Sequence, residues 1–225
     1  SPFLDGQATG AHSQRWRQFP ITPQQVPLFE NHQHYIDWMH TQLEQQQMRN
    51  VRHFWGSVRP NGPERPQQLN RVELRVCDLV SDPRDLLAIT AFAELRLLQL
   101  IDRGQSEDPL FSSELSPAEL AELADHNDQQ AALTSLDAEL RHWRDGRSIS
   151  ARQWIQDQLQ DLKSWGDQQP AMAWLDRLPA LLERGNTAMQ WLQRQQSGES
   201  ISAILSADIA ALAALEQDLL MGGLG

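Results

Sequence analysis

The sequence predicts an α+β protein in which one antiparallel β-hairpin precedes a mostly helical region. Two observations predict this class. Residues 53–59 and 71–78 alternate between apolar and polar side chains, which is the period of half-buried strands. Residues 82–220 instead repeat apolar side chains at helical spacing, between recognisable start and stop signals. We therefore expect a hairpin at about 51–79 and a helical C-terminal region at 104–225.

The loop of the predicted hairpin leaves its register open. Residues 60–66 contain three prolines and a glycine, a composition typical of a loop. A connection of this length does not fix how the two strands pair. The register matters because it decides which side chains of the two strands share a face.

The first two predicted helices have clear starts. Asn31 can cap a helix from about residue 32 to 47. Asp82 followed by Pro83 starts another helix, which runs through Ile101 and ends at Gly104. The second helix is apolar over a wide face, so we expect it to pack against the apolar side of the hairpin.

Further start and stop signals divide the remaining chain into helices. Ser116 and Glu119 form a capping box that opens a helix, and we expect it to reach about Arg144, where Asp145-Gly146 closes it. Four more helices are predicted at about 150–165, 171–184, 186–195 and 202–221.

The second predicted strand carries its charges on one face. Arg71, Glu73 and Arg75 alternate with apolar residues, so one carboxylate lies between two guanidinium groups. Such a row can hold a divalent cation on the carboxylate and phosphate oxygens on the arginines. If the polar faces of the two strands coincide, Arg59 joins them. The simpler interpretation is a solvated face on which arginine and glutamate merely pair.

Three segments around this strand resemble a known family. Residues 52–63, 69–71 and 73–78 look like the carboxylate–amine ligases of the glutamate–cysteine ligase type 2 family, in particular its cyanobacterial-type branch. The opening loop before Arg15 is similar to the same family. The likeness is dense to about residue 103 and looser afterwards, where Asn127 and residues 135–140 continue it.

The resemblance implies a fold and a reaction. Residues 1–103 would be part of a catalytic domain with a glutamine-synthetase-like antiparallel sheet. The implied reaction is ATP-dependent ligation of the γ-carboxylate of glutamate to cysteine through an acyl phosphate. Its product, γ-glutamylcysteine, is the first intermediate of glutathione biosynthesis. The implied cofactors are ATP and Mg²⁺.

The same resemblance suggests roles for five side chains. Glu73 is the candidate Mg²⁺ ligand, and Arg75 the candidate contact for the transferring phosphoryl group. Arg59 would hold a phosphate or the substrate carboxylate. Arg15 would bind glutamate or nucleotide from the first loop, and Arg71 would support the site from behind.

The chain departs from the family in length. Ligases of this family are much longer, and their first half carries further strands and acidic metal ligands. We therefore expect this chain to be a C-terminal portion whose partner is the missing N-terminal half. By itself it would be a partial and inactive enzyme.

Composition limits the other classes of function. A net charge of −11 argues against nucleic-acid binding, which relies on a basic surface. A single cysteine excludes an internal disulfide framework and fits a reducing compartment. No stretch is apolar enough to predict a membrane span. The expected location is the cytoplasm.

Two alternatives to cysteine ligation stay open at this stage. The residues that choose the acceptor amine cannot be recognised, so the chain could belong to a glutamate ligase for another amine. It could also be a non-catalytic helical interaction fragment. That alternative predicts an exposed apolar patch where a partner docks.

Overall fold

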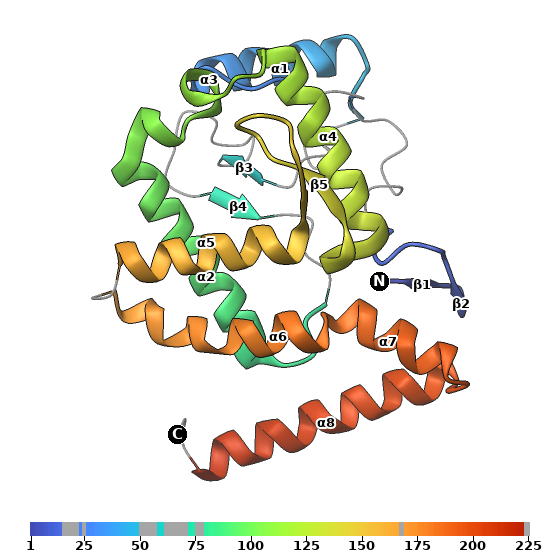
Figure 1. Cartoon of the computed structure of the whole chain (residues 1–225). Coiled ribbons are helices and arrows are strands. Elements are labelled where there is room, and N and C mark those ends of the chain that lie inside the picture. The colour runs from blue at the N-terminus through green and yellow to red at the C-terminus, as the bar shows by residue number, and fades with distance from the viewer. Residues whose placement is uncertain are drawn as a thin grey trace. The chain divides into compact units, whose positions relative to one another are not determined.

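A computed structural model describes residues 1–14, 23, 26–49, 58–60, 72–74, 79–166 and 169–222. These residues form helices and three two-stranded antiparallel sheets, so the predicted α+β class is confirmed (Figure 1). In the part of the chain so described, no helix combines the length and the apolar character that crossing a membrane requires.

Each strand that the structure describes pairs with its neighbour in sequence. The pairs are β1 (Phe3–Leu4) with β2 (Gln7–Ala8), β3 (Val58–Pro60) with β4 (Val72–Leu74), and β5 (Glu139–Arg141) with β6 (Ser148–Ser150). The α-helices are α1 (His32–Glu44), α2 (Pro83–Arg103), α3 (Pro109–Ser112), α4 (Pro117–Thr134), α5 (Ala151–Trp165), α6 (Leu178–Arg184), α7 (Thr187–Gln196) and α8 (Ile201–Gly222). The 3₁₀ helices are η3 (Gly104–Glu107), η4 (Ser135–Asp137) and η5 (Pro170–Arg177).

The chain folds as two compact units built from interleaved segments. Unit 1 comprises Ser1–His12, Leu79–Gln99 and Arg152–Gly225. Unit 2 comprises Ser13–Asp78 and Leu100–Ala151. The division predicted at residue 103 stays a prediction.

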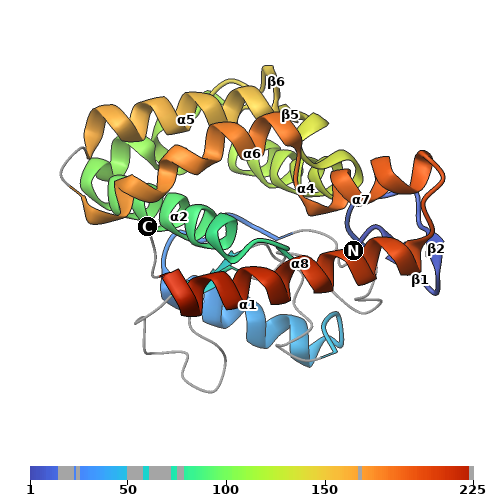
Figure 2. The ribbon, with the colours of Figure 1, turned by 90° about the horizontal axis from the view of Figure 1, so that it is seen from below.

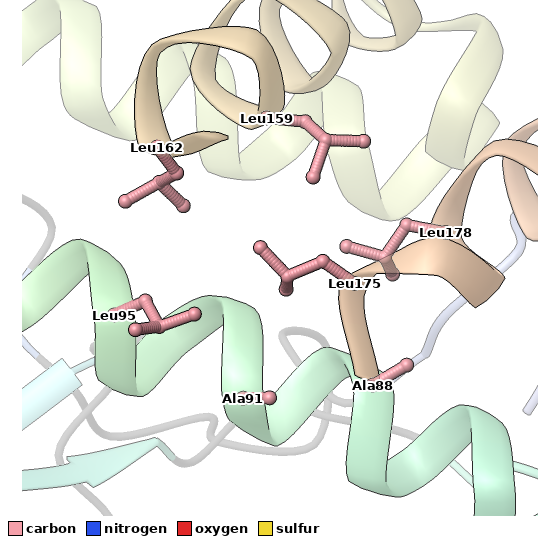
Figure 3. Packing of buried hydrophobic residues seen from close by; sticks show 7 residues of the cluster. All are labelled: Ala88, Ala91, Leu95, Leu159, Leu162, Leu175 and Leu178. Carbon is pink, nitrogen blue, oxygen red and sulfur yellow. The ribbon is translucent and has the colours of Figure 1, made fainter. Parts of the chain in front are cut away.

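The core of unit 1 forms where α2 meets α5 and the η5–α6 segment. On α2 the small or branched residues at positions 88, 91 and 95 recur with helical spacing and so share one face. They pack against leucines of the other helices (Figure 3). The buried cluster consists of Ala88, Ala91, Leu95, Leu159, Leu162, Leu175 and Leu178.

Unit 2 has a smaller core under α1. The Asn31 side chain accepts a hydrogen bond from the His34 backbone N–H, which confirms the predicted N-cap. Tyr35, Ile36 and Met39 are buried along one face of the helix. Phe29 meets the Tyr35 ring edge-on and fixes the chain that enters α1.

The helix predicted from Pro117 to about Arg144 is wrong beyond Thr134. Its capping box is confirmed, because Ser116 Oγ accepts from the Glu119 N–H and the Glu119 carboxylate accepts from the Ser116 N–H. After η4, however, residues 139–150 form the β5–β6 hairpin. The Asp145-Gly146 pair that we interpreted as a helix stop lies in the loop of residues 142–147 that joins β5 to β6, with Gly146 at φ +72°.

The later helical predictions hold with one change of type. The helices expected at about 150–165, 186–195 and 202–221 correspond to α5, α7 and α8. The segment expected at 171–184 begins as the 3₁₀ helix η5 and becomes α-helical only at Leu178. It ends at Gly185, directly after the predicted range, and Gly185 has φ +85°.

Candidate functional site

The β3–β4 hairpin carries the candidate site and lies in unit 2 (Figure 1). The predicted antiparallel pairing is confirmed, and the structure supplies the register that the sequence left open. Val58 pairs with Leu74, Arg59 with Glu73, and Pro60 with Val72. Directly opposed residues of an antiparallel pair share a face, with Cβ atoms about 4.5–5.5 Å apart. Arg59 and Glu73 therefore share one face of the hairpin.

Glu73 is the site residue whose side chain the structure describes, and it is partly buried. Mg²⁺ is commonly held by one or two carboxylates, with waters and substrate phosphates completing the shell. A single glutamate at this position fits that ligand chemistry.

The other predicted site residues are placed only in part. Arg59 belongs to β3 and is located by its backbone register. Arg15, Arg71 and Arg75 lie outside the described residues, so the row of alternating charge around Glu73 stays a prediction. Among the residues that are described, no three histidine, cysteine, aspartate or glutamate side chains gather as a metal site would need.

A polar hollow in unit 2 was not foreseen from the sequence. It lies between α1 and α4 and has a volume of about 670 Å³. Trp38, Glu122, Asp125 and His126 contribute to its lining. Burial, together with the nearby Asp128 carboxylate, raises the pKa of Asp125 to about 6. The only signal in the sequence is the spacing of two aspartates three apart on a helix.

A hydrogen-bond network in unit 1 fixes the chain just after the predicted second strand. Ser81 Oγ donates to Asp208 Oδ2 over 3.0 Å, and the Ser81 N–H donates to Thr187 Oγ1 over 3.3 Å. Asp208 also accepts from Trp191 Nε1 at 2.6 Å and from Arg194 at 3.1 Å. One carboxylate of α8 thus ties this helix to the preceding helix α7 and to Ser81, which is remote in sequence.

A model of a known protein family matches the sequence of the hairpin and of most of the chain around it. The model of the glutamate-cysteine ligase family 2 matches residues 1–207. The chain belongs to this family. The matched region includes both strands of the β3–β4 hairpin and the whole of α2.

Two curated relatives share this family likeness across nearly the whole chain. A protein of Gloeobacter violaceus is 26% identical over 213 residues, which covers 94% of this chain and 54% of the relative. One from Sorangium cellulosum is 24% identical over 210 residues, covering 91% of this chain and 52% of the relative. Both carry the name "Putative glutamate--cysteine ligase 2". The chain therefore spans about half the length of these relatives.

Proposed function

We propose that the chain contributes the phosphate-binding hairpin of an ATP-dependent ligase that joins the γ-carboxylate of glutamate to the amine of cysteine. The observation that carries the proposal is the pairing of Arg59 with Glu73 across β3 and β4. This register puts a guanidinium-bearing residue and a carboxylate on one face, within a family named for glutamate–cysteine ligation. The family's glutamine-synthetase-like sheet, of which the hairpin would be two strands, belongs to the same proposal.

The reaction has two group transfers. A γ-carboxylate oxygen of glutamate attacks the γ-phosphorus of ATP, and ADP leaves as an acyl phosphate forms. The cysteine amine then attacks the acyl carbon, inorganic phosphate leaves, and the amine loses its proton. The products are γ-glutamylcysteine, ADP and phosphate. This reaction is the first step towards glutathione.

Both transfers build negative charge on phosphoryl oxygens, and the hairpin supplies the opposite charge. Arg75 would contact the transferring group and Arg59 a phosphate or the substrate carboxylate, because planar guanidinium groups match both. Arg15 would bind glutamate or nucleotide, and Arg71 would orient its neighbours. Glu73 would hold Mg²⁺, which when bound neutralises charge on the phosphate oxygens.

The direct test is ADP release with Mg²⁺, ATP, glutamate and cysteine. Because the chain spans about half of its relatives, it is assayed alone and with the remaining part of the Gloeobacter violaceus relative co-expressed. We expect release that depends on both amino acids in at least one of these preparations. Glu73→Gln should lower it by about 10²–10³-fold, the usual scale for losing one transition-state electrostatic contact. Release that is undiminished in this variant would contradict the metal-binding role.

The acceptor amine is tested in the same assay. Replacing cysteine with other amino acids and small amines should abolish release if cysteine is the acceptor. Release stimulated more strongly by another amine would keep the ligase chemistry and change the substrate. No release with any amine, in either preparation, would favour a non-catalytic interaction fragment.

A further inference from the structure

Helix α2 has two apolar faces, and only one of them is used by the core of unit 1. Ala88, Ala91 and Leu95 point towards α5 and the η5–α6 segment (Figure 3). A second set of large apolar residues is exposed to solvent. This outer face consists of Leu86, Leu87, Leu97, Leu98 and Ile101.

The outer face is continuous along the helix. At 100° per residue its five members fall within an arc of about 120°, which borders the buried cluster on one flank. Thr90 and Glu94 are the only polar residues inside that arc. The exposed fractions run from 36% for Leu97 to 76% for Ile101, which lies at the middle of the arc. A solvent-facing stripe normally carries charged and polar residues, so this composition indicates a docking surface.

The length of the relatives points to one occupant of this face. The family match includes every residue of α2, so the outer face belongs to the part that the chain shares with the family. The Gloeobacter violaceus relative has nearly as much polypeptide again outside the matched region. A second copy of this chain is a poorer occupant, because each copy carries a net charge of −11.

We infer that the outer face of α2 binds the polypeptide that makes up the other half of these longer ligases. The outer face supplies the apolar centre of that interface. The inference rests on family membership and on the exposure of the outer face, and it does not depend on the ligation reaction. Its test therefore measures binding in the absence of ATP and substrates.

The test is co-expression of the 225-residue chain with a tagged probe, the part of the Gloeobacter violaceus relative outside the matched region. We expect the tagged probe to retain the chain in a 1:1 complex. Ile101→Lys should reduce the retained chain at least about tenfold, since a charge at the centre of an apolar interface must be desolvated. The matched control is Ile209→Lys on α8, because Ile209 is similarly exposed at 69% and lies beyond the family match. The tagged probe should retain the Ile209→Lys variant as well as it retains the parent chain.

Folding and self-association are checked on the same variants. Circular dichroism should show unchanged helix content in Ile101→Lys, because the side chain it replaces is 76% exposed. Equal retention of the two lysine variants would overturn the inference, as would no retention with the corresponding probes from both relatives. Sedimentation velocity of the chain alone should show a monomer. If the chain alone forms a dimer and Ile101→Lys dissociates it, the outer face binds a second copy of this chain. That result would also overturn the inference.

Discussion

Asp85 shows how single side chains hold unit 1 together. It lies in the first turn of α2 and its side chain is only 9% exposed. Arg177 donates to Asp85 Oδ1 over 3.0 Å, and Arg184 donates to the other carboxylate oxygen. The same arginine at position 177 also bonds Asp82 at 3.1 Å. A buried carboxylate with two guanidinium partners fixes α2 against the η5–α6 segment.

Replacing Asp85 should therefore destabilise the protein measurably. We expect Asp85→Asn to lower the free energy of unfolding by about 1–3 kcal/mol, less than for a fully buried pair because both arginines remain partly exposed. Urea denaturation followed by circular dichroism measures the loss. The matched control is Asp176→Asn, whose carboxylate is 80% exposed beside Lys163 and should matter by less than about 0.5 kcal/mol. Equal losses would show that burial of the Asp85 carboxylate is unimportant.

Asp125 makes a prediction about pH. Its pKa of about 6 in the folded protein exceeds the value of about 3.9 in an unfolded chain, so the folded state binds its proton more tightly. The resulting stability is fully present below about pH 4 and is lost as pH rises through 6. Because the Asp125 carboxyl is partly exposed, solvent screening limits the loss in the free energy of unfolding to about 1 kcal/mol. Asp125→Asn should be more stable than the parent at pH 7.5 and equal to it at pH 4. A variant no more stable than the parent at pH 7.5 would contradict the raised pKa.

At the scale of elements, the β5–β6 hairpin is held by a side chain of the preceding helix. The Asn127 amide of α4 donates to the Arg141 carbonyl and accepts from the Arg141 N–H, both over 2.8 Å. A single asparagine thus satisfies both backbone groups of a β5 residue, as another strand would. The sequence could not show this. The helical periodicity that starts at Ser116 has no marked break at Thr134, and the Asp-Gly pair serves equally as a helix stop or a hairpin turn.

Because Asn127 both donates and accepts, we expect two substitutions of this residue to have different effects. Asn127→Ala removes both bonds, so we expect a loss of about 1–2 kcal/mol and about tenfold faster hydrogen exchange at the Arg141 amide. Asn127→Asp keeps the acceptor for that amide but sets a carboxylate oxygen against the Arg141 carbonyl. It should destabilise the protein while leaving the Arg141 amide better protected than in the alanine variant. Gln129→Ala, an exposed change in the same helix, is the control and should alter neither measurement.

For the whole molecule, the sequence indicated the elements better than their assembly. Caps at Asn31 and Ser116 depend on neighbouring residues, and both were predicted correctly. The pairing of Arg59 with Glu73 could not be predicted, because register is a property of two strands and their loop. The bond from Ser81 to Asp208 spans 127 positions, and no local pattern encodes such a contact. The roles of Arg15, Arg71 and Arg75 stay predictions.

How far the stabilising contacts of unit 1 extend along α8 is also a property of the whole molecule. The family match stops at residue 207, one position before Asp208. Yet Asp208 accepts from Ser81, Trp191 and Arg194, and Trp191 is itself 5% exposed. The Asp208 network thus anchors the first turns of α8, the long helix seen lengthwise in Figure 2. Most later residues of this helix are exposed.

Two truncations test which part of α8 stabilises unit 1. A chain ending at Ala207 leaves the buried Trp191 N–H without its acceptor, and we expect it to lose about 2–4 kcal/mol of stability. A chain ending at Ala214 keeps the Asp208 network and should lose less than half as much. Urea unfolding of both chains measures the difference, and Asp208→Ala in the full chain should reproduce most of the first loss. Equal losses in the two truncated chains would place the stabilising contacts in the later turns of α8 instead.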